Sequence, residues 1–125
     1  MTAIHIDDSK LSLKLFKKFF LKVFPDFTIN SYTPKEYLSQ RDNLGDFDII
    51  ITDLLMPEIS GFEIVEDIYK NFKSTKGIFL VVMSSNIQDA VKSELFEKGV
   101  KVFIEKPITL DKMKILKEEF EKWNS

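Results

Sequence analysis

Three aspartates, one serine and one lysine each follow a short apolar run, and together they offer the groups that phosphoryl transfer uses. Asp7 and Asp8 come after the first run, Asp53 after the run Ile-Ile-Thr, Ser84 after a fourth run and Lys106 after a fifth. An aspartate carboxylate can serve as a covalent nucleophile toward a phosphoryl group. Phosphoryl transfer also needs the charge on the equatorial oxygens to be neutralised, and a hydroxyl and an ammonium supply part of that neutralisation.

The three carboxylates also predict a divalent cation. Two carboxylates about 4 Å apart repel each other by about 4 kcal/mol at an effective dielectric of ~20. The single ammonium of Lys106 does not balance three of them. Carboxylate oxygens are hard ligands, which suit Mg²⁺ held by a few carboxylates and water. We therefore expect Mg²⁺ as the cofactor, with an open position for a phosphate oxygen.

Each of these residues also has a purely structural interpretation. An Asp-Ser pair before a helix is commonly an N-cap, and a lone serine after a strand often caps a helix. A lone aspartate after a strand is commonly a turn residue, and the pair Lys106-Pro107 alone indicates little. The functional interpretation is favoured because all of these residues follow predicted strands, in one consistent pattern along the chain.

The position of these residues depends on an alternation of strand-like and helix-like segments. Strands are predicted at residues 3–6, 27–31, 47–52, 78–83 and 101–105, and helices at residues 10–24, 33–44, 61–72, 85–98 and 109–123. This order predicts an α/β fold in which a five-stranded parallel sheet carries helices on both faces. In open sheets of this kind ligands bind beyond the carboxyl ends of the strands, so the polar residues should meet at one edge.

Several local patterns support these elements. Thr33 and Glu36 form a predicted capping box with Pro34 at the first helical position, and Gly99 suits the end of the fourth helix. In the first helix, lysines occupy one face and apolar residues at helical spacing are assigned to the core: Leu15, Phe16, Phe19, Phe20 and Val23. We expect His5 to be a core histidine bonded to a neighbour, with a metal or phosphohistidine role as the alternative.

Composition narrows the class of protein. A chain of 125 residues is expected to form one domain, residues 1–125. The net charge of −2 argues against a general binder of nucleic acid or of anionic membranes. The chain has no cysteine, and no apolar run reaches the ~20 residues of a membrane span. With no signal peptide in the first residues, we expect a cytoplasmic protein with no direct nucleic-acid or membrane partner.

Over residues 1 to about 123 the chain resembles the receiver domain of two-component response regulators, the CheY-like superfamily. The resemblance rests on the following residues and their spacing: Asp7-Asp8, Asp53, Met56, Pro57, Gly61, Ser84, Gly99 and Lys106-Pro107. It implies a doubly wound, flavodoxin-like (βα)5 fold with strand order 2-1-3-4-5. It also implies a non-enzymatic phosphoprotein that phosphorylates itself from a donor and loses the group by autodephosphorylation.

The resemblance assigns a role to each matched residue. Asp53 would be the phosphoacceptor, Asp8 and Asp53 would ligate Mg²⁺ with the backbone carbonyl of Leu55, and Asp7 would act through water. Ser84 would bond a phosphoryl oxygen and Lys106 would pair with Asp53 or its phosphate. The remaining matched residues would shape the loops, with the Lys106–Pro107 bond a candidate cis peptide: Met56, Pro57, Gly61 and Pro107.

Two further positions would set how the signal behaves. Phe103 matches the aromatic switch position, which turns inward when Ser84 engages the phosphoryl group. Leu55 and Asn86 occupy the positions that tune phosphoryl lifetime. Because leucine cannot orient a water for hydrolysis, the hypothesis is a longer-lived phosphoryl state than in the fast chemotaxis type.

The expected function is phosphorylation-dependent signalling in a two-component system or phosphorelay. The donor would be a sensor histidine kinase or a histidine phosphotransfer protein, whose contact often includes the first helix. A downstream protein partner would read the face made by the fourth helix, fifth strand and fifth helix, with the chain a monomer or a weak phosphorylation-dependent dimer. The chain ends after its last helix, which fits a stand-alone receiver or a fragment of a longer regulator.

Two other functions remain alternatives. A phosphorylation-independent binding module could keep the same fold. An aspartate-dependent phosphatase of the haloacid-dehalogenase type would need a second aspartate two residues after Asp53, where Leu55 stands.

Overall fold

Five parallel strands form one sheet in the order β2-β1-β3-β4-β5 in the computed structural model, which describes residues 1–43, 46–71, 77–86 and 88–125. The strands are β1 (Thr2–Ile6), β2 (Thr28–Tyr32), β3 (Ile49–Asp53), β4 (Phe79–Ser84) and β5 (Val100–Glu105). The helices are α1 (Lys10–Val23), α2 (Pro34–Gln40), α3 (Gly61–Asn71), α4 (Asp89–Glu97) and α5 (Leu110–Asn124), with the short 3₁₀ helix η1 (Arg41–Asn43) after α2. The predicted doubly wound α/β fold and its strand order 2-1-3-4-5 are confirmed. None of the described helices is long and apolar enough to cross a membrane.

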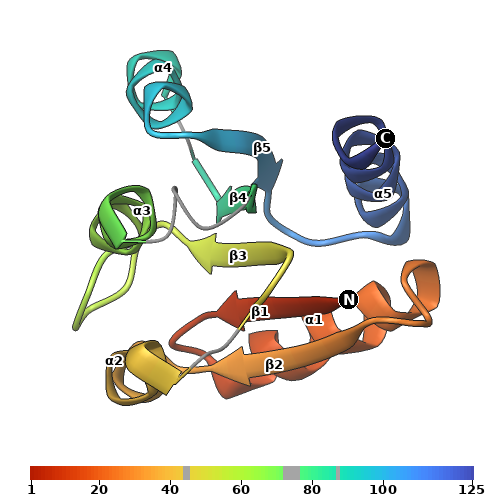
Figure 1. Ribbon diagram of the computed structural model, residues 1–125, viewed down its shortest axis with the longest axis horizontal. Coiled ribbons are helices and arrows are strands. Elements are labelled where there is room, and N and C mark those ends of the chain that lie inside the picture. Colours follow the sequence, from red (N-terminus) through yellow and green to blue (C-terminus); the bar gives the residue numbers. More distant parts are fainter. Residues whose placement is uncertain (44–45, 72–76, 87) are drawn as a thin grey trace.

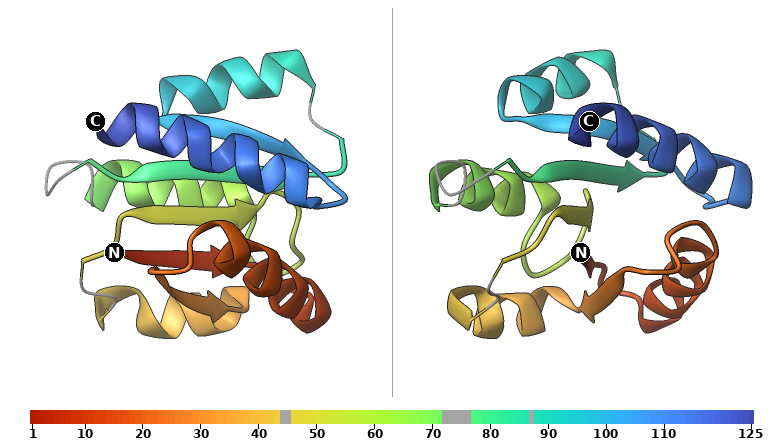
Figure 2. Two further views of the ribbon diagram at one scale, coloured as in Figure 1. Left: turned by 90° about the vertical axis from the view of Figure 1, so that its right-hand side faces the viewer. Right: turned by 45° about the vertical axis from the view of Figure 1, so that its right-hand side comes forward.

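The helices divide between the two faces of the sheet. Helices α1 and α5 cover one face, and α2, α3 and α4 cover the other (Figure 1). Every residue of β3 and β4 is buried, as expected of central strands with helices on both sides. The turned views show α5 lying across β4 and β5, with the strands running side by side beneath it (Figure 2). The sheet thus has two separate cores, one on each face.

Aromatic rings join α1 and α5 across the first core. The rings of Phe20, Phe24 and Phe27 lie within 5.6 Å of one another by their centroids. Phe120 of α5 packs edge to face on Phe24 and Phe27. Each such pair contributes about 0.5–1.5 kcal/mol beyond the burial of its area. The cluster therefore holds the end of α1 and the C-terminal part of α5 together at the amino end of the sheet, away from the predicted site.

One core assignment in α1 is wrong. Leu15 is 45% exposed, and Leu13 is buried in its place. The buried stripe runs through Leu13, Phe16, Phe20 and Val23, which follow each other by three or four residues as one helix face requires. Leu15 lies beside this stripe, so its side chain borders the core without entering it.

The helix ends mostly follow the predicted signals. Thr33 and Glu36 form the capping box, and Gly99 has a φ of 94° after the end of α4, a conformation that favours glycine. Helix α4 was expected to open at residues 85–88, but it begins at Asp89 after Gln88, which caps it without a side-chain bond. Strands β2 and β4 lie one residue later than predicted, and the predicted end of the third helix at residue 72 lies outside the described residues.

A polar cluster that the sequence did not reveal ties α2 and η1 to α3. The Tyr37 hydroxyl, fully buried, donates to Asp67 Oδ2 over 2.7 Å, and the Arg41 guanidinium pairs with the same carboxylate. Burial raises the pKa of Tyr37 well above its usual value, and the Asp67 carboxylate adds to the effect. The hydroxyl therefore stays protonated and keeps donating throughout the ordinary pH range.

His5 sits in the middle of β1 and is fully buried. Its ring centroid lies 4.1 Å from that of Phe16, which confirms the core placement. The expected hydrogen bond is absent, because neither ring nitrogen has a partner in the described part of the chain. Burial, aided by the Lys106 ammonium, lowers the pKa of His5 from 6.5 to about 3, so the folded protein holds this ring neutral.

We expect His5→Leu to stabilise the protein, and to do so more strongly at acid pH. Between pH 6.5 and 3 the unfolded chain binds a proton that the folded chain refuses, so the free energy of unfolding falls as the pH falls. At pH 5 the loss is about 2 kcal/mol, and removal of the unpartnered nitrogens adds about 1 kcal/mol at every pH. Urea unfolding of both proteins at pH 8 and pH 5, without divalent ions, measures the difference. His5 is the only histidine in the sequence, so parallel stability curves for the two proteins would contradict the prediction.

Candidate functional site

Three carboxylates meet at the carboxyl ends of β1 and β3. Asp7 and Asp8 follow β1, and Asp53 is the last residue of β3. The two strands are paired in parallel with Ile6 opposite Thr52, so their ends lie at the same edge of the sheet. One carboxylate oxygen from each of the three aspartates lies within 4.8 Å of the others. Asp7 and Asp53 are buried, whereas Asp8 is exposed to solvent.

Lys106 brings the one cation that contacts this cluster among the described residues. Its Nζ lies 3.2 Å from Asp53 Oδ2 and 3.3 Å from Asp7 Oδ2. Burial works against the ammonium, but the carboxylates of Asp53 and Asp7 outweigh it and hold the pKa of Lys106 above its usual value. The lysine therefore stays charged and sits between the two buried carboxylates.

The pKa of Asp7 shifts upward for a different reason. Burial raises it most, and the nearby Asp53 carboxylate raises it further. The backbone N–H of Ser9, which donates to Asp7 Oδ1 over 2.9 Å, and the Lys106 ammonium oppose the rise. The upward direction shows that burial, with help from Asp53, outweighs the Ser9 N–H and the Lys106 ammonium at Asp7.

Hydrogen bonds that the sequence does not reveal hold the loop that carries Lys106. The Lys106 N–H donates to the Ser84 carbonyl over 3.0 Å, and the Lys106–Pro107 peptide bond is cis, as expected. The Lys112 ammonium donates to the carbonyls of Glu105 and Pro107 over 2.7 and 2.9 Å. A lysine in the first turn of a helix is unfavourable, because it lies at the positive end of the helix dipole. Its position in the first turn of α5 therefore indicates from the sequence that Lys112 has a partner outside the helix.

The loop after β3 passes very close to the backbone of Asp53. The Gly61 N–H donates to the Leu54 carbonyl over 2.8 Å. A Cβ on Gly61 would lie 2.5 Å from the carbonyl oxygen of Asp53 and 2.7 Å from the Cα of Leu54, closer than any side chain tolerates. Glycine at this position is therefore needed for the close approach of α3 to the acidic residue, with Met56 buried and Pro57 exposed in the intervening loop.

Ser84 and Phe103 make contacts outside the acidic cluster. The Ser84 hydroxyl is buried and donates to the Asn86 carbonyl over 3.3 Å, while the Asn86 N–H donates back to it. Within the described residues no hydrogen bond joins Ser84 to the aspartates. Phe103, partly buried, packs edge to face against Phe96 of α4. Both residues are therefore held by neighbours in their own segment of the chain.

The two positions expected to tune phosphoryl lifetime are open to solvent. Leu55 is 67% exposed, although it directly follows the buried Leu54. Asn86 is also exposed, two residues beyond Ser84. Neither side chain is therefore needed for the core.

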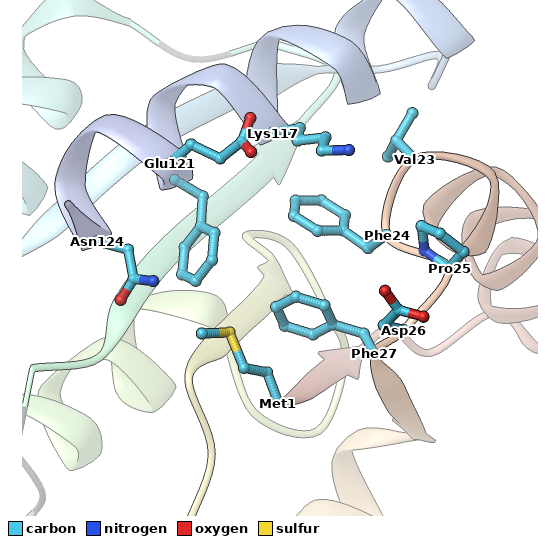
Figure 3. A pocket seen from close by; sticks show the side chains of 10 residues that line it. Met1, Val23, Phe24, Pro25, Asp26, Phe27, Lys117, Glu121 and Asn124 are labelled. Atoms are coloured by element: carbon cyan, nitrogen blue, oxygen red, sulfur yellow. The ribbon is translucent and has the colours of Figure 1, made fainter.

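Two hollows flank the α1 and α5 face. One, of about 410 Å³, opens beside the acidic cluster and is lined by Asp7, Ser12, Leu15, Phe16, Phe19, Met83, Ser85, Lys106, Pro107 and Ile108. The other, of about 310 Å³, lies between the end of α1, the start of β2 and the C-terminal part of α5, where the rings of Phe24 and Phe27 face Lys117 and Asn124 across it (Figure 3). Only the first hollow includes residues of the predicted site.

The chemistry of the donor set fits a hard divalent cation. The three aspartates supply carboxylate oxygens, and against three negative charges the structure places one ammonium. Asp8 is exposed, so the open side of the cluster faces water. Oxygen ligands with several waters are the ligands that Mg²⁺ prefers.

A family model for the response regulator receiver domain matches residues 3–117. This match covers most of the chain, and the fold and the acidic edge agree with it, so the chain belongs to the response regulator receiver domain family. The expected resemblance to two-component receivers of the CheY-like type is confirmed.

Individual relatives agree. The chain is 24% identical to the two-component response regulator ORR21 of Oryza sativa subsp. indica over 114 residues, covering 91% of this chain and 16% of the rice protein. It is 27% identical to the hybrid signal transduction histidine kinase A of Dictyostelium discoideum over 124 residues, covering 97% of this chain and 6% of that protein. It therefore spans only a small part of both relatives.

Solved structures show the same architecture. A CheY-like response regulator receiver domain from Methanospirillum hungatei superposes with a TM-score of 0.81 at 19% identity, covering 98% of this chain and 95% of that one. At this identity the likeness supports the fold.

We expect Mg²⁺ to stabilise the protein, because a ligand that binds only the folded state shifts the unfolding equilibrium. At ~5 times its dissociation constant the gain is about 1 kcal/mol, or about 4 °C in the melting temperature of a domain of this size. Asp8→Asn should abolish the Mg²⁺ effect and raise the melting temperature without metal, since it removes one repelling charge. Circular dichroism melts with and without MgCl₂ measure both effects. The exposed Asp26→Asn is the matched control, and an equal Mg²⁺ response in Asp8→Asn would contradict the assignment.

Proposed function

We propose that this chain is a phosphorylation-dependent signalling receiver in which Asp53 accepts a phosphoryl group from a phosphohistidine donor. The observation that carries the proposal is the contact of Lys106 with both Asp53 and Asp7 inside a cluster of three carboxylates. Membership of the receiver family supports the assignment. The Dictyostelium relative, a hybrid histidine kinase by its name, supports a histidine-based donor.

The proposed transfer is an in-line displacement at phosphorus. A carboxylate oxygen of Asp53 attacks, an O–P bond forms, and the P–N bond to the donor imidazole breaks. The electron pair of that bond returns to the imidazole nitrogen, which takes up a proton. Attack of water on the acyl phosphate later restores the Asp53 carboxylate and releases inorganic phosphate. Positioning and charge neutralisation carry most of the catalysis in such transfers.

The neighbours of Asp53 have separate tasks in this proposal. Asp8, Asp53 and the backbone carbonyl of Leu55 would hold Mg²⁺ directly, with Asp7 acting through water. The bound ion would supply positive charge to the phosphoryl oxygens. Lys106, whose Nζ is 3.2 Å from Asp53, would remain paired with the phosphorylated side chain and offset part of its added charge.

The switch would begin at Ser84. Its hydroxyl is held by Asn86 over 3.3 Å, a long bond that a phosphoryl oxygen, a stronger acceptor, can replace. Movement of Ser84 and the β4–α4 loop would let Phe103 turn inward and change the face made by α4, β5 and α5. A downstream protein partner would read this change, so a local charge event becomes a surface event.

The donor would approach over α1 and the loop after β5. Helix α1 has no acidic residue, and its exposed face carries five lysines: Lys10, Lys14, Lys17, Lys18 and Lys22. The apolar hollow beside Asp7 and Lys106 borders the exposed Leu15 of this helix. A donor with an acidic rim and an apolar side chain near its phosphohistidine would fit this surface, because opposite charges orient an encounter.

Incubation with Mg²⁺ and a small phosphodonor such as phosphoramidate should add one phosphoryl group to the intact protein. The mass increase should disappear in Asp53→Ala, because that variant lacks the nucleophile, and remain in Asp26→Ala. Intact mass spectrometry gives the answer directly. Absence of an adduct with both a small donor and a phosphohistidine protein would favour the phosphorylation-independent binding module, and turnover of unrelated phosphate esters would favour a phosphatase.

We also expect the phosphoryl group on Asp53 to persist for minutes or longer, because the exposed Leu55 cannot hold a water against it. Leu55→Asn should speed dephosphorylation several-fold by supplying a polar group. Leu55 is 67% exposed, so the substitution should leave the fold intact. Decay of the phosphorylated mass after donor removal measures both rates, with Leu38→Asn on α2 as the control. Loss of the group from the wild-type protein within seconds would refute the expectation.

A further inference from the structure

Two aromatic rings meet on the α4 side of β5. The ring centroids of Phe96 on α4 and Phe103 on β5 are 4.8 Å apart, and the ring planes cross at 84°. This is the edge-to-face geometry that aromatic pairs prefer. Phe103 is partly buried against the second core, whereas Phe96 is 52% exposed. Phe96 is therefore the outer member of the pair.

The surroundings of Phe103 lead back to Ser84. A hollow of about 220 Å³ is lined by Asn86, Lys92, Phe103 and Glu105. Asn86 is the residue whose carbonyl accepts the Ser84 hydroxyl, and Glu105 lies opposite Ser84 in the sheet. Phe103 thus contacts the Phe96 ring and also borders a hollow lined by Asn86, the residue that holds Ser84.

We propose that Phe96 is a positioning residue, whose ring holds Phe103 in the resting position seen here and so opposes the response to phosphorylation of Asp53. The inference rests on the proposed function, since it concerns the regulation of that same site. In the proposed switch Phe103 would leave its resting position by giving up the edge-to-face contact, so that the contact would exist in the resting state alone. An interaction present in one state shifts the equilibrium between them, by roughly 2- to 10-fold for one aromatic pair.

Phe96→Ala tests this role, because the exposed ring can be removed with little effect on folding. The first measurement is the NMR position of the Phe103 ring signals in the unphosphorylated protein without metal. The second is the apparent Kd for beryllofluoride, a phosphoryl mimic, in the presence of Mg²⁺. In Phe96→Ala the Phe103 signals should move toward their beryllofluoride-bound position, and the apparent Kd should fall roughly 2- to 10-fold. Phe96→Tyr keeps the ring and should remain close to wild type.

Two controls separate positioning from a general surface effect. Leu38→Ala removes a comparably exposed apolar side chain from α2, 46% exposed, and should change neither measurement. In a Phe103→Ala background, removal of Phe96 should no longer change the apparent Kd. If the wild type binds beryllofluoride and Phe96→Ala binds it equally well, the positioning role is overturned. If the wild type itself binds no beryllofluoride, the proposed function fails and the inference fails with it.

Discussion

The unequal charge at the carboxyl edge of the sheet is the constraint on which the rest of the structure depends. Three carboxylates converge within 4.8 Å, and one ammonium, that of Lys106, stands between two of them. Such a cluster opposes folding, since each buried charge loses hydration and repels its neighbours. The chain holds it together with the pairing of β1 and β3 and with a β5–α5 loop anchored by Lys112. The cluster therefore lowers the free energy of unfolding, and the same negative charge gives this edge an affinity for cations.

Two residues of the proposed switch are held by modest local contacts. Ser84 is engaged by Asn86, and Phe103 is engaged by Phe96. Each contact is worth about 1 kcal/mol, so the stronger bonds that the proposed phosphoryl group would accept can replace it. The arrangement therefore suits the proposed switch, whose resting state would be held by contacts weak enough to be exchanged.

Much of the fold, and the meeting of the three aspartates with Lys106 at one edge, could be predicted from the sequence because both depend on local patterns. The apolar runs of β3 and β4 and the capping box at Thr33 are readable without tertiary information. The position of aspartates after strands brought Asp7 and Asp53 to one edge by topology alone.

What failed depended on packing between distant segments. Leu15 was assigned to the core, but it lies at the border of the α1 stripe, and the packing of α1 on the sheet and α5 decides which residues at that border are buried. The start of α4 was predicted too early, because Ser84 and Asn86 bond each other in the loop before the helix. Two features have no signature in the chain, since their surroundings come from other elements. They are the Tyr37–Asp67 bond and the His5 ring nitrogens, which have no hydrogen-bond partner among the described residues.

The lysines of α1 have a consequence for the molecule as a whole. Helix α1 carries a charge of +5 in a chain with a net charge of −2, so the remainder carries −7. Because α1 lies on one side of the sheet (Figure 1), positive charge is concentrated on that side although the total charge is nearly neutral. The electric field of an acidic surface will orient the protein with α1 toward that surface before contact forms. The apolar hollow beside Lys106 will then face the same surface. The rate of encounter with an acidic surface should then fall as the salt concentration rises, over the range in which the Debye length shrinks from about 30 to about 8 Å.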